Sequence, residues 1–131
     1  MFPSHAAAPD WPQLRRRLIA GVFFFGLRVL PGGDYGFAWD PNGTTARDFE
    51  HFINLFDYTS NEVLSAATQL GGHIMDMGDE LGLVNEAYLA DLLLIDGNPV
   101  QEVTLLQARE NLLMMMKDGE YHQPPRPRKP A

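Results

Sequence analysis

Apolar and polar positions alternate with the period of an α-helix in the middle of the chain. One helix is expected to begin near Thr44 or Thr45, because apolar residues then recur at intervals of three and four: Phe49, Phe52, Ile53 and Phe56. Thr59 and Glu62 have the spacing of a capping box, which predicts the start of a second helix. The apolar face of that helix consists of Val63, Leu64, Ala67 and Leu70.

The pattern changes from helical to extended in the last third of the chain. Gly71-Gly72 should interrupt the second helix, and a short helix should follow to Gly78. Residues 104–110 should form one or two helical turns, and Asp118-Gly119 is a strong hairpin signal. The predicted strands are short: Gly82–Val84, a buried strand over Ala90–Ile95, and the hairpin arms Leu112–Lys117 and Glu120–His122.

The first part of the chain predicts a helix followed by a strand. Asp10 is a suitable N-cap for a helix over residues 11–24, and Gly26 can end it. Leu27–Leu30 is then a predicted strand, which Pro31-Gly32-Gly33 ends. A helix, a tight turn and a strand make an αβ unit, which favours a parallel sheet.

Arg15–Arg17 precede an apolar run over residues 18–27, a pattern similar to a secretory signal. The run begins late, Arg28 follows it directly, and no small-x-small cleavage site comes after it. Ten residues are also too few to cross a bilayer, which takes about 20. We therefore expect a helix that runs into a strand, and no membrane segment.

Composition and charge narrow the possible functions. The 131 residues suit one domain, 45% are hydrophobic, and there is no cysteine to form a thiolate metal site or nucleophile. A net charge of −7 opposes a phosphate backbone, which argues against general nucleic-acid binding. The tail over residues 124–131 holds three basic residues, four prolines and no acid. It is expected to be extended and solvated, with an SH3-type ligand as the alternative.

Asp34 is the strongest candidate for chemistry. It directly follows a predicted strand and Gly32-Gly33, and it precedes a loop rich in aromatic residues. Ligands in parallel α/β folds bind where strands end, and a carboxylate there can bind a metal or act as a general base. An Asp after two glycines is also common in turns that have no catalytic role.

Other site chemistries receive little support. The four histidines, His5, His51, His73 and His122, form no closely spaced pair, so they are expected at the surface or at caps. No dinucleotide fingerprint, Walker loop or Gly-x-Ser-x-Gly elbow is present. Met114–Met116 are expected to pack in a core, and Asp91 is expected to hold neighbouring backbone in a structural role.

Four segments together resemble the amidohydrolase superfamily. Gly26–Asp34 is similar to its last barrel strand, and Thr59–Gly72 is similar to its "pe-alraaT-ngA" helix. Leu81–Pro99 resembles "lGlv-eGylADlllvdgdP", and Met116–Tyr121 resembles the terminal hairpin. The resemblance covers residues 12–123 in order. Gly33–Trp39 looks like the imidazolonepropionase- and prolidase-related branch.

The resemblance implies an α/β protein: the C-terminal fragment of a (β/α)8 TIM barrel of a metal-dependent hydrolase, plus part of a small β-sandwich domain. The chain then divides into an irregular N-terminus (1–10), the last barrel αβα segment (11–78), a β-domain portion (79–123) and the Pro/Arg-rich tail (124–131). A cytoplasmic location is expected.

The resemblance also implies a reaction and its residues. The complete family enzyme uses a divalent metal, with zinc as the expected ion, to hydrolyse carbon–nitrogen bonds in a small-molecule amide, dipeptide or cyclic amide. Asp34 would bind the metal, accept a proton from the attacking water and pass it to the leaving nitrogen. Tyr35 and Trp39 would line the substrate pocket.

The chain also departs from the family pattern. The family's His-x-His, its bridging Lys and its two later metal-binding histidines have no counterpart here, and Ala87 replaces a usual Gly. One interpretation is part of an amidohydrolase that is inactive and binds no metal alone, whose remaining part is a separate upstream-half chain or was lost by truncation. The alternatives are a non-catalytic interaction or assembly module, and a small α/β domain with only superficial resemblance. The isolated chain is expected to be marginally stable, self-associating or partly exposed on its barrel-facing side.

Overall fold

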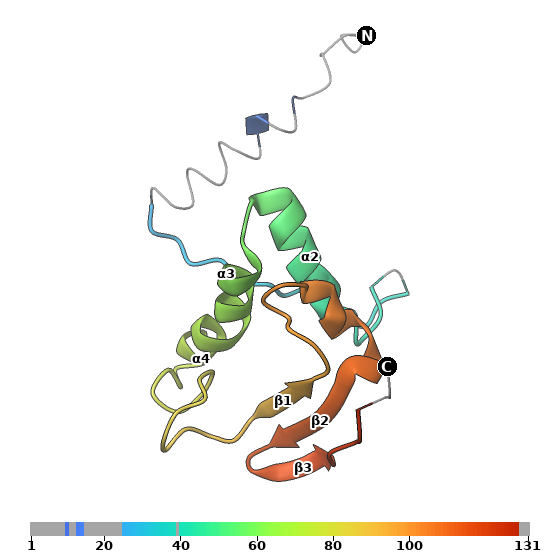
Figure 1. Ribbon diagram of the computed structural model, residues 1–131. Coiled ribbons are helices and arrows are strands. Elements are labelled where there is room, and N and C mark those ends of the chain that lie inside the picture. The colour runs from blue at the N-terminus through green and yellow to red at the C-terminus, as the bar shows by residue number, and fades with distance from the viewer. Residues whose placement is uncertain (1–9, 11–12, 15–24, 39, 129–131) are drawn as a thin grey trace, which may run out of the picture.

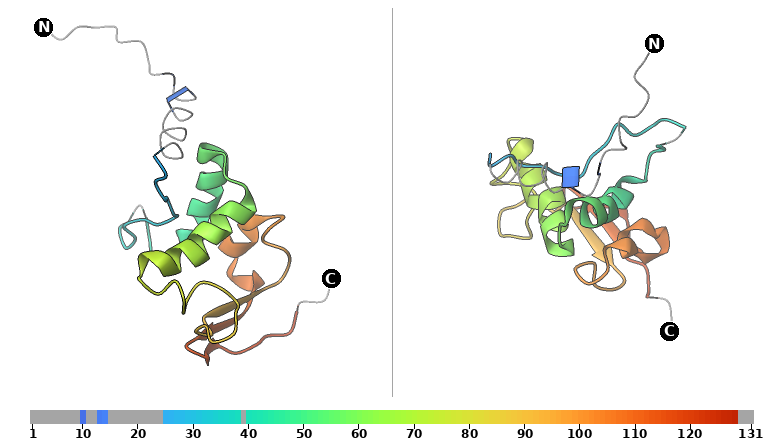
Figure 2. Two further views of the ribbon diagram at one scale, coloured as in Figure 1. Left: turned by 90° about the vertical axis from the view of Figure 1, so that its left-hand side faces the viewer. Right: turned by 90° about the horizontal axis from the view of Figure 1, so that it is seen from above.

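The protein was analysed as a computed structural model, which describes residues 10, 13–14, 25–38 and 40–128. A helical part comes first, with α2 (Thr45–Phe56), α3 (Ser60–Ser65), the π-helical turn η1 (Ala66–Leu70) and α4 (Gly71–Ile74). A three-stranded sheet follows, with the 3-10 helices η2 (Val103–Gln107) and η3 (Arg109–Asn111) between its first two strands. Figure 1 shows the helices above the sheet, and the views in Figure 2 show η2 beside α2, which it contacts.

The N-terminal cap of the first predicted helix is present. The backbone N–H of Gln13 donates to the Asp10 carboxylate over 3.3 Å, and Leu14 N donates to the Asp10 carbonyl over 2.9 Å. The rest of that predicted helix, residues 11–12 and 15–24, lies outside the described residues. Gly26 has the left-handed backbone of a helix-ending residue, with φ +63°.

The strand predicted over Leu27–Leu30 is wrong for the structure as described. These residues are extended but belong to no strand, and the side chains of Leu27 and Val29 are exposed. A strand exists only through hydrogen bonds to a neighbouring strand. No described strand lies beside this segment, so the described residues form no parallel sheet there.

The two central helices begin where the pattern predicts. α2 starts at Thr45, and the ring of Phe52 lies 5.3 Å from the rings of both Phe56 and Tyr58. The capping box of α3 is complete. Glu62 N donates to Thr59 Oγ1 over 3.2 Å, and Thr59 N donates to the Glu62 carboxylate over 2.8 Å.

Gly71 and Gly72 do not interrupt the second helix, contrary to the prediction. Helical backbone runs from α3 through η1 into α4 and ends at Ile74 instead of reaching Gly78. A Cβ on Gly72 would lie 2.3 Å from the carbonyl oxygen of Leu81. The glycine therefore permits close approach of a later loop and does not break the helix.

The sheet is antiparallel and has the order β1-β2-β3, with β1 (Leu92–Ile95), β2 (Leu112–Lys117) and β3 (Glu120–Gln123). Leu93 pairs with Met115, and Lys117 pairs with Glu120. The predicted hairpin turn is confirmed: Asp118 and Gly119 both have positive φ, at 51° and 79°, as a type I′ turn requires. The predicted helical turns also form, as η2 and η3.

Two strand predictions need correction. Gly82–Val84 forms a bend instead of a strand, and Gly82 has φ +95°. The strand predicted over Ala90–Ile95 is shorter, begins at Leu92, and is not buried: Leu93 is 56% exposed and Leu94 is 47% exposed. Met114–Met116 of β2 are only half-buried. No second layer formed by the described residues covers this sheet.

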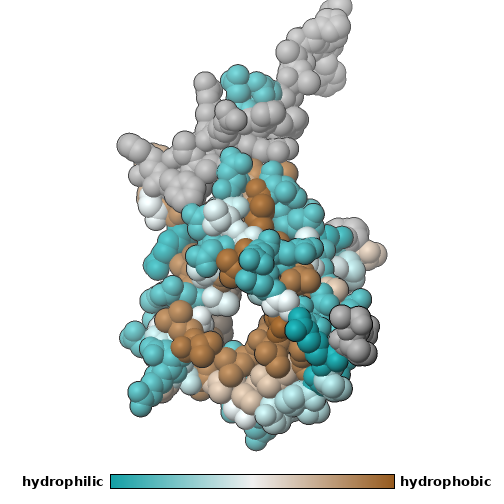
Figure 3. Space-filling model, viewed as in Figure 1, coloured by the Kyte–Doolittle hydropathy of each residue, from teal (hydrophilic) through white to brown (hydrophobic). Residues whose placement is uncertain are grey.

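Three hydrophobic side chains are buried among the described residues: Val63, Ala66 and Val103. Many large ones are exposed: Phe25, Leu27, Phe37, Ile74, Met75, Val84, Leu93, Leu94 and Val100, among others. Figure 3 shows apolar surface bordering an opening between the helical part and the sheet. The eight-stranded barrel and the β-sandwich expected from the resemblance are not formed by the described residues, which make a small α/β unit.

The described part of the tail is exposed but anchored, which differs from the expected solvated end. Arg126 N donates to the Leu113 carbonyl over 2.9 Å, and its guanidinium donates to the carbonyl of Leu112 over 2.6 Å. Arg128 forms an ion pair with Asp96 at 2.5 Å. Both arginines of the proposed SH3-type motif are therefore engaged within the chain. Among the described helices, none has the length and apolar character needed to cross a membrane.

Candidate functional site

Asp34 lies at the end of the extended segment that precedes the aromatic loop. Pro31 is buried, whereas Gly32, Gly33 and Asp34 are exposed. The structure records no hydrogen bond or ion pair between the Asp34 side chain and any described residue. Its carboxylate is exposed to solvent.

Tyr35 turns back toward the helical part of the molecule. Its hydroxyl donates a short hydrogen bond to Asp48 in the first turn of α2. Burial raises the pKa of Tyr35 to about 12, and the hydrogen bond to Asp48 adds to that rise. The phenol thus keeps its proton at neutral pH. The family resemblance implies a substrate-pocket position for Tyr35, and nothing in the sequence indicates Asp48 as its partner.

The rest of the aromatic loop closes onto the start of α2. Gly36 N donates to the Asp40 carbonyl over 2.9 Å, and Asp40 N donates to the Phe37 carbonyl over 3.1 Å. The Asp40 carboxylate accepts from Thr44 Oγ1 over 2.9 Å and lies 3.7 Å from Arg47 Nη2. The loop is thus tied at both of its ends. Trp39, the other predicted pocket residue, lies outside the described residues.

Side chains that could bind a metal do not cluster among the described residues. These residues contain no group of three or more His, Asp or Glu side chains that could hold an ion. His73 packs against Gly78, where a Cβ would lie 2.2 Å from its Nδ1. His5 lies outside the described residues, and His51 and His122 are exposed. The described residues therefore form no complete metal site.

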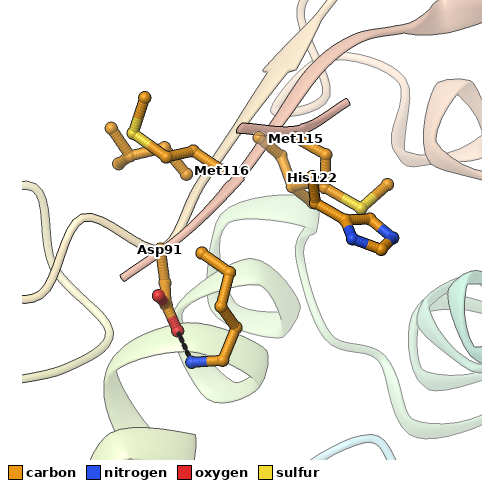
Figure 4. Close-up of a pocket in the computed structure, with 7 residues that line it drawn as sticks. Asp91, Met115, Met116 and His122 are labelled. Atoms are coloured by element: carbon orange, nitrogen blue, oxygen red, sulfur yellow. Dashed lines mark hydrogen bonds and ion pairs between the residues drawn. The ribbon is translucent and has the colours of Figure 1, made fainter. Parts of the chain in front are cut away.

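A hollow of about 390 Å³ lies on the sheet, and the sequence analysis did not predict it. Leucine and methionine side chains of β1 and β2 line it, together with His122 of β3. Figure 4 shows Met115 and His122 pointing to one side and Met116 to the other. The continuous apolar runs of β1 and β2 were the available signal, but they were interpreted as core.

The Asp91–Lys117 pair borders this hollow and has a structural role, as predicted for Asp91. Asp91 accepts from the backbone N–H of Asp118 over 2.7 Å and from Lys117 Nζ over 3.0 Å. The backbone hydrogen bond, followed by the lysine, lowers the pKa of Asp91. The carboxylates of Asp91 and Asp118 raise the pKa of Lys117. Asp91 therefore fixes the hairpin turn between β2 and β3.

Comparison with known proteins gives matches among solved structures. Neither the family models nor the curated proteins contain a significant match. A protein described as a prolidase from Bifidobacterium longum is 24% identical, with a TM-score of 0.73 over 85% of this chain and 26% of its own. A Xaa-Pro dipeptidase with bound methionine is 23% identical, with a TM-score of 0.69 and the same two coverages. A protein described as an amidohydrolase is 29% identical, with a TM-score of 0.54 over 59% of this chain and 18% of its own.

The chain has the fold of part of an amidohydrolase. The resemblance predicted from the sequence is thus confirmed at the level of the fold. The chain spans about a quarter of the length of these amidohydrolase-type structures. Most of their fold therefore has no counterpart in the sequence described here.

Proposed function

We propose that this chain is the C-terminal part of a metal-dependent amidohydrolase that hydrolyses carbon–nitrogen bonds in a small molecule, and that it is inactive alone. The candidate substrates are amides, dipeptides and cyclic amides. The observation that carries this proposal is the fold match to a prolidase and a Xaa-Pro dipeptidase, which extends over 85% of this chain and 26% of theirs. A cytoplasmic location belongs to the same proposal.

Asp34 is the residue of this chain that we propose to bind the metal and to accept the proton of the attacking water. Its carboxylate is exposed, and it stands between an extended segment and a closed loop. A divalent ion such as zinc, when bound, would lower the pKa of that water. Because the described residues do not form a complete metal site, the remaining ligands would come from an upstream-half chain.

Hydrolysis assays on the chain alone and in complementation test the proposal. The isolated chain, with added divalent metal, should not turn over a panel of amide, dipeptide and cyclic-imide substrates. Mixing it with a polypeptide that carries the upstream part of an amidohydrolase should restore hydrolysis of at least one substrate. Turnover by the isolated chain would contradict the proposal that it depends on a partner.

Asp34→Asn should abolish the restored activity, because an amide is a poor metal ligand and cannot accept the proton. Asp57→Asn is the matched control. Asp57 is also exposed, and it lies in the left-handed region (φ 57°) that asparagine tolerates. Unchanged activity in Asp34→Asn would show that the site is assigned to the wrong residue.

A non-catalytic assembly module is the second candidate, and the apolar surface favours it. Three hydrophobic side chains are buried among the described residues, whereas Leu93, Leu94 and Val84 are among many that are exposed. An exposed apolar surface of this kind marks an interaction site. Formation of the complemented complex without hydrolysis of any substrate in the panel would select this alternative.

A further inference from the structure

The two neighbours of Asp34 in the chain touch each other. The ring of Tyr35 lies over Gly33, so that a Cβ on Gly33 would be 3.2 Å from Tyr35 Cζ and 3.4 Å from its hydroxyl oxygen. Asp34 is the residue between them. The backbone on both sides of the exposed carboxylate is therefore held by one side chain.

That side chain is itself anchored to a helix. The Tyr35 hydroxyl donates to the carboxylate of Asp48, in the first turn of the twelve-residue helix α2. Tyr35 is half-buried, whereas Asp34 is exposed. The anchor joins residues thirteen positions apart, so it fixes the loop against a separate element.

The chain directly after Tyr35 is fixed to the same end of α2. The N–H groups of Gly36 and Phe37 both donate to the Asp40 carbonyl, over 2.9 and 3.2 Å. The side chain of Asp40 accepts from Thr44, the N-cap residue of α2. Tyr35 therefore stands between two attachments to one helix terminus, and its hydroxyl is already occupied.

We infer that Tyr35 and Asp48 are positioning residues for Asp34, and that Tyr35 does not serve as a substrate contact. The ring holds Gly33, the hydroxyl holds Asp48, and together they limit the orientations of the carboxylate between them. Holding a reacting group in one geometry contributes strongly to rate, and small displacements of it are costly. The inference rests on the proposed function for the reaction that Asp34 serves, but the contacts themselves do not.

The first test measures backbone order without any activity. Amide ¹⁵N relaxation of Gly33 and Asp34 in the full chain should show increased motion in Tyr35→Phe and Asp48→Ala. Asp48→Asn should remain close to wild type, because its amide oxygen still accepts the hydrogen bond. Unchanged relaxation in both Tyr35→Phe and Asp48→Ala would overturn the inference.

Two adjacent glycines provide a matched pair that removes no polar group. Gly33→Ala places a methyl group against the Tyr35 ring and should displace it, so Asp34 should become more mobile. Gly32→Ala adds the same methyl group where no atom lies within 4 Å, and neither glycine has a positive φ. Equal effects of the two substitutions would show that general loop stiffness, and not the ring contact, is responsible.

Kinetics of the complemented enzyme separate positioning from substrate binding. Tyr35→Phe should lower kcat roughly tenfold with KM unchanged, since the misplacement affects the reacting group. A raised KM with unchanged kcat would assign Tyr35 to the substrate and overturn the inference. If relaxation responds as expected but no hydrolysis is restored even with wild-type chain, the contact stands and the proposed function fails. If hydrolysis is restored and every Tyr35 and Asp48 variant matches wild type in kcat and relaxation, the inference fails and the function stands.

Discussion

The helical part and the sheet differ in how well the described residues bury their hydrophobic side chains. Two of the three buried hydrophobic side chains, Val63 and Ala66, lie in the helical part defined above, α2 to α4. The α3 capping box has both of its hydrogen bonds. The sheet strands contain no fully buried residue, and Leu93 and Leu94, whose side chains point to opposite faces of the sheet, are both exposed. The helical part holds itself together, whereas the sheet presents apolar surface that the described chain leaves uncovered.

The two edges of the sheet show the same contrast on a smaller scale. The β3 side is followed by the Pro-rich tail, whose Arg126 donates to carbonyl groups near the start of β2. The β1 edge, Leu92–Ile95, carries only apolar residues and lies on the side of the sheet toward the helices (Figure 1). Proteins usually protect edges with charge or proline. Among the described residues, the β1 edge is therefore the less protected of the two.

The largest expected effect is at Gly82, whose backbone lies close to Thr68 of the helical part. Gly82→Ala should cost about 3 kcal/mol of unfolding free energy, because a Cβ would lie 2.4 Å from the Thr68 carbonyl oxygen and φ is +95°. Gly43→Ala has a similar φ, +93°, and no atom within 4 Å, so it should lose only about 1 kcal/mol. Urea unfolding at one protein concentration measures both. Equal losses would mean that the contact with Thr68 does not matter.

A pair of truncations compares the two regions directly. Val63→Ala should cost about 2 kcal/mol, because Val63 is fully buried and the change leaves a cavity. Leu94→Ala removes more atoms but should cost less than about 1 kcal/mol, because Leu94 is 47% exposed in the sheet. The same urea experiment is suitable. A larger loss at Leu94 would break the comparison, since it would mean that the free chain covers its sheet.

Ala87 lies in the loop between the two regions, and its replacement by glycine should stabilise the chain. Its φ is +65°, in the left-handed region that glycine adopts more readily than alanine. Ala87→Gly should therefore gain about 1 kcal/mol by removing left-handed strain. Ala90→Gly is the control: Ala90 has no positive φ, so the added flexibility should lower stability. A loss of stability at both positions would contradict the strained turn.

The smallest effect concerns the charge pair at the hairpin. Because the pKa of Asp91 is lowered in the folded chain, its contribution is complete above the ordinary value of 3.8 and disappears as pH falls through the lowered value. The raised pKa of Lys117 acts oppositely: its contribution is present below 10.5 and is lost as pH rises beyond it. The difference in unfolding midpoint between wild type and Asp91→Asn should therefore shrink in acid. A constant difference would mean that the pair does not stabilise the turn.

Features set by neighbouring residues were predictable from the sequence. The capping box at Thr59, the start of α2 and the Asp118-Gly119 turn each depend on a few adjacent positions. The predictions failed where distant backbone decides the outcome. Gly72 permits contact with Leu81 instead of ending a helix, and Leu27–Leu30 has no strand to pair with.

In the candidate site, too, the sequence suggested one residue but not the contact beside it. Asp34 is a candidate because of its place after a predicted strand and because of the family resemblance, and its role stays a prediction. The contact between Tyr35 and Asp48 was not predicted, because it joins a loop to a helix thirteen residues later and has no pattern of its own. Charge and spacing alone cannot show which hydroxyl a folded loop brings to which carboxylate.

Residue-resolved amide hydrogen exchange of the dilute chain tests the difference between the two regions most directly. We expect slow amide hydrogen exchange in α2 and α3 and fast exchange along β1, whose outer edge has no partner strand among the described residues. Protection of the β1 amides equal to that of the helices would contradict this expectation.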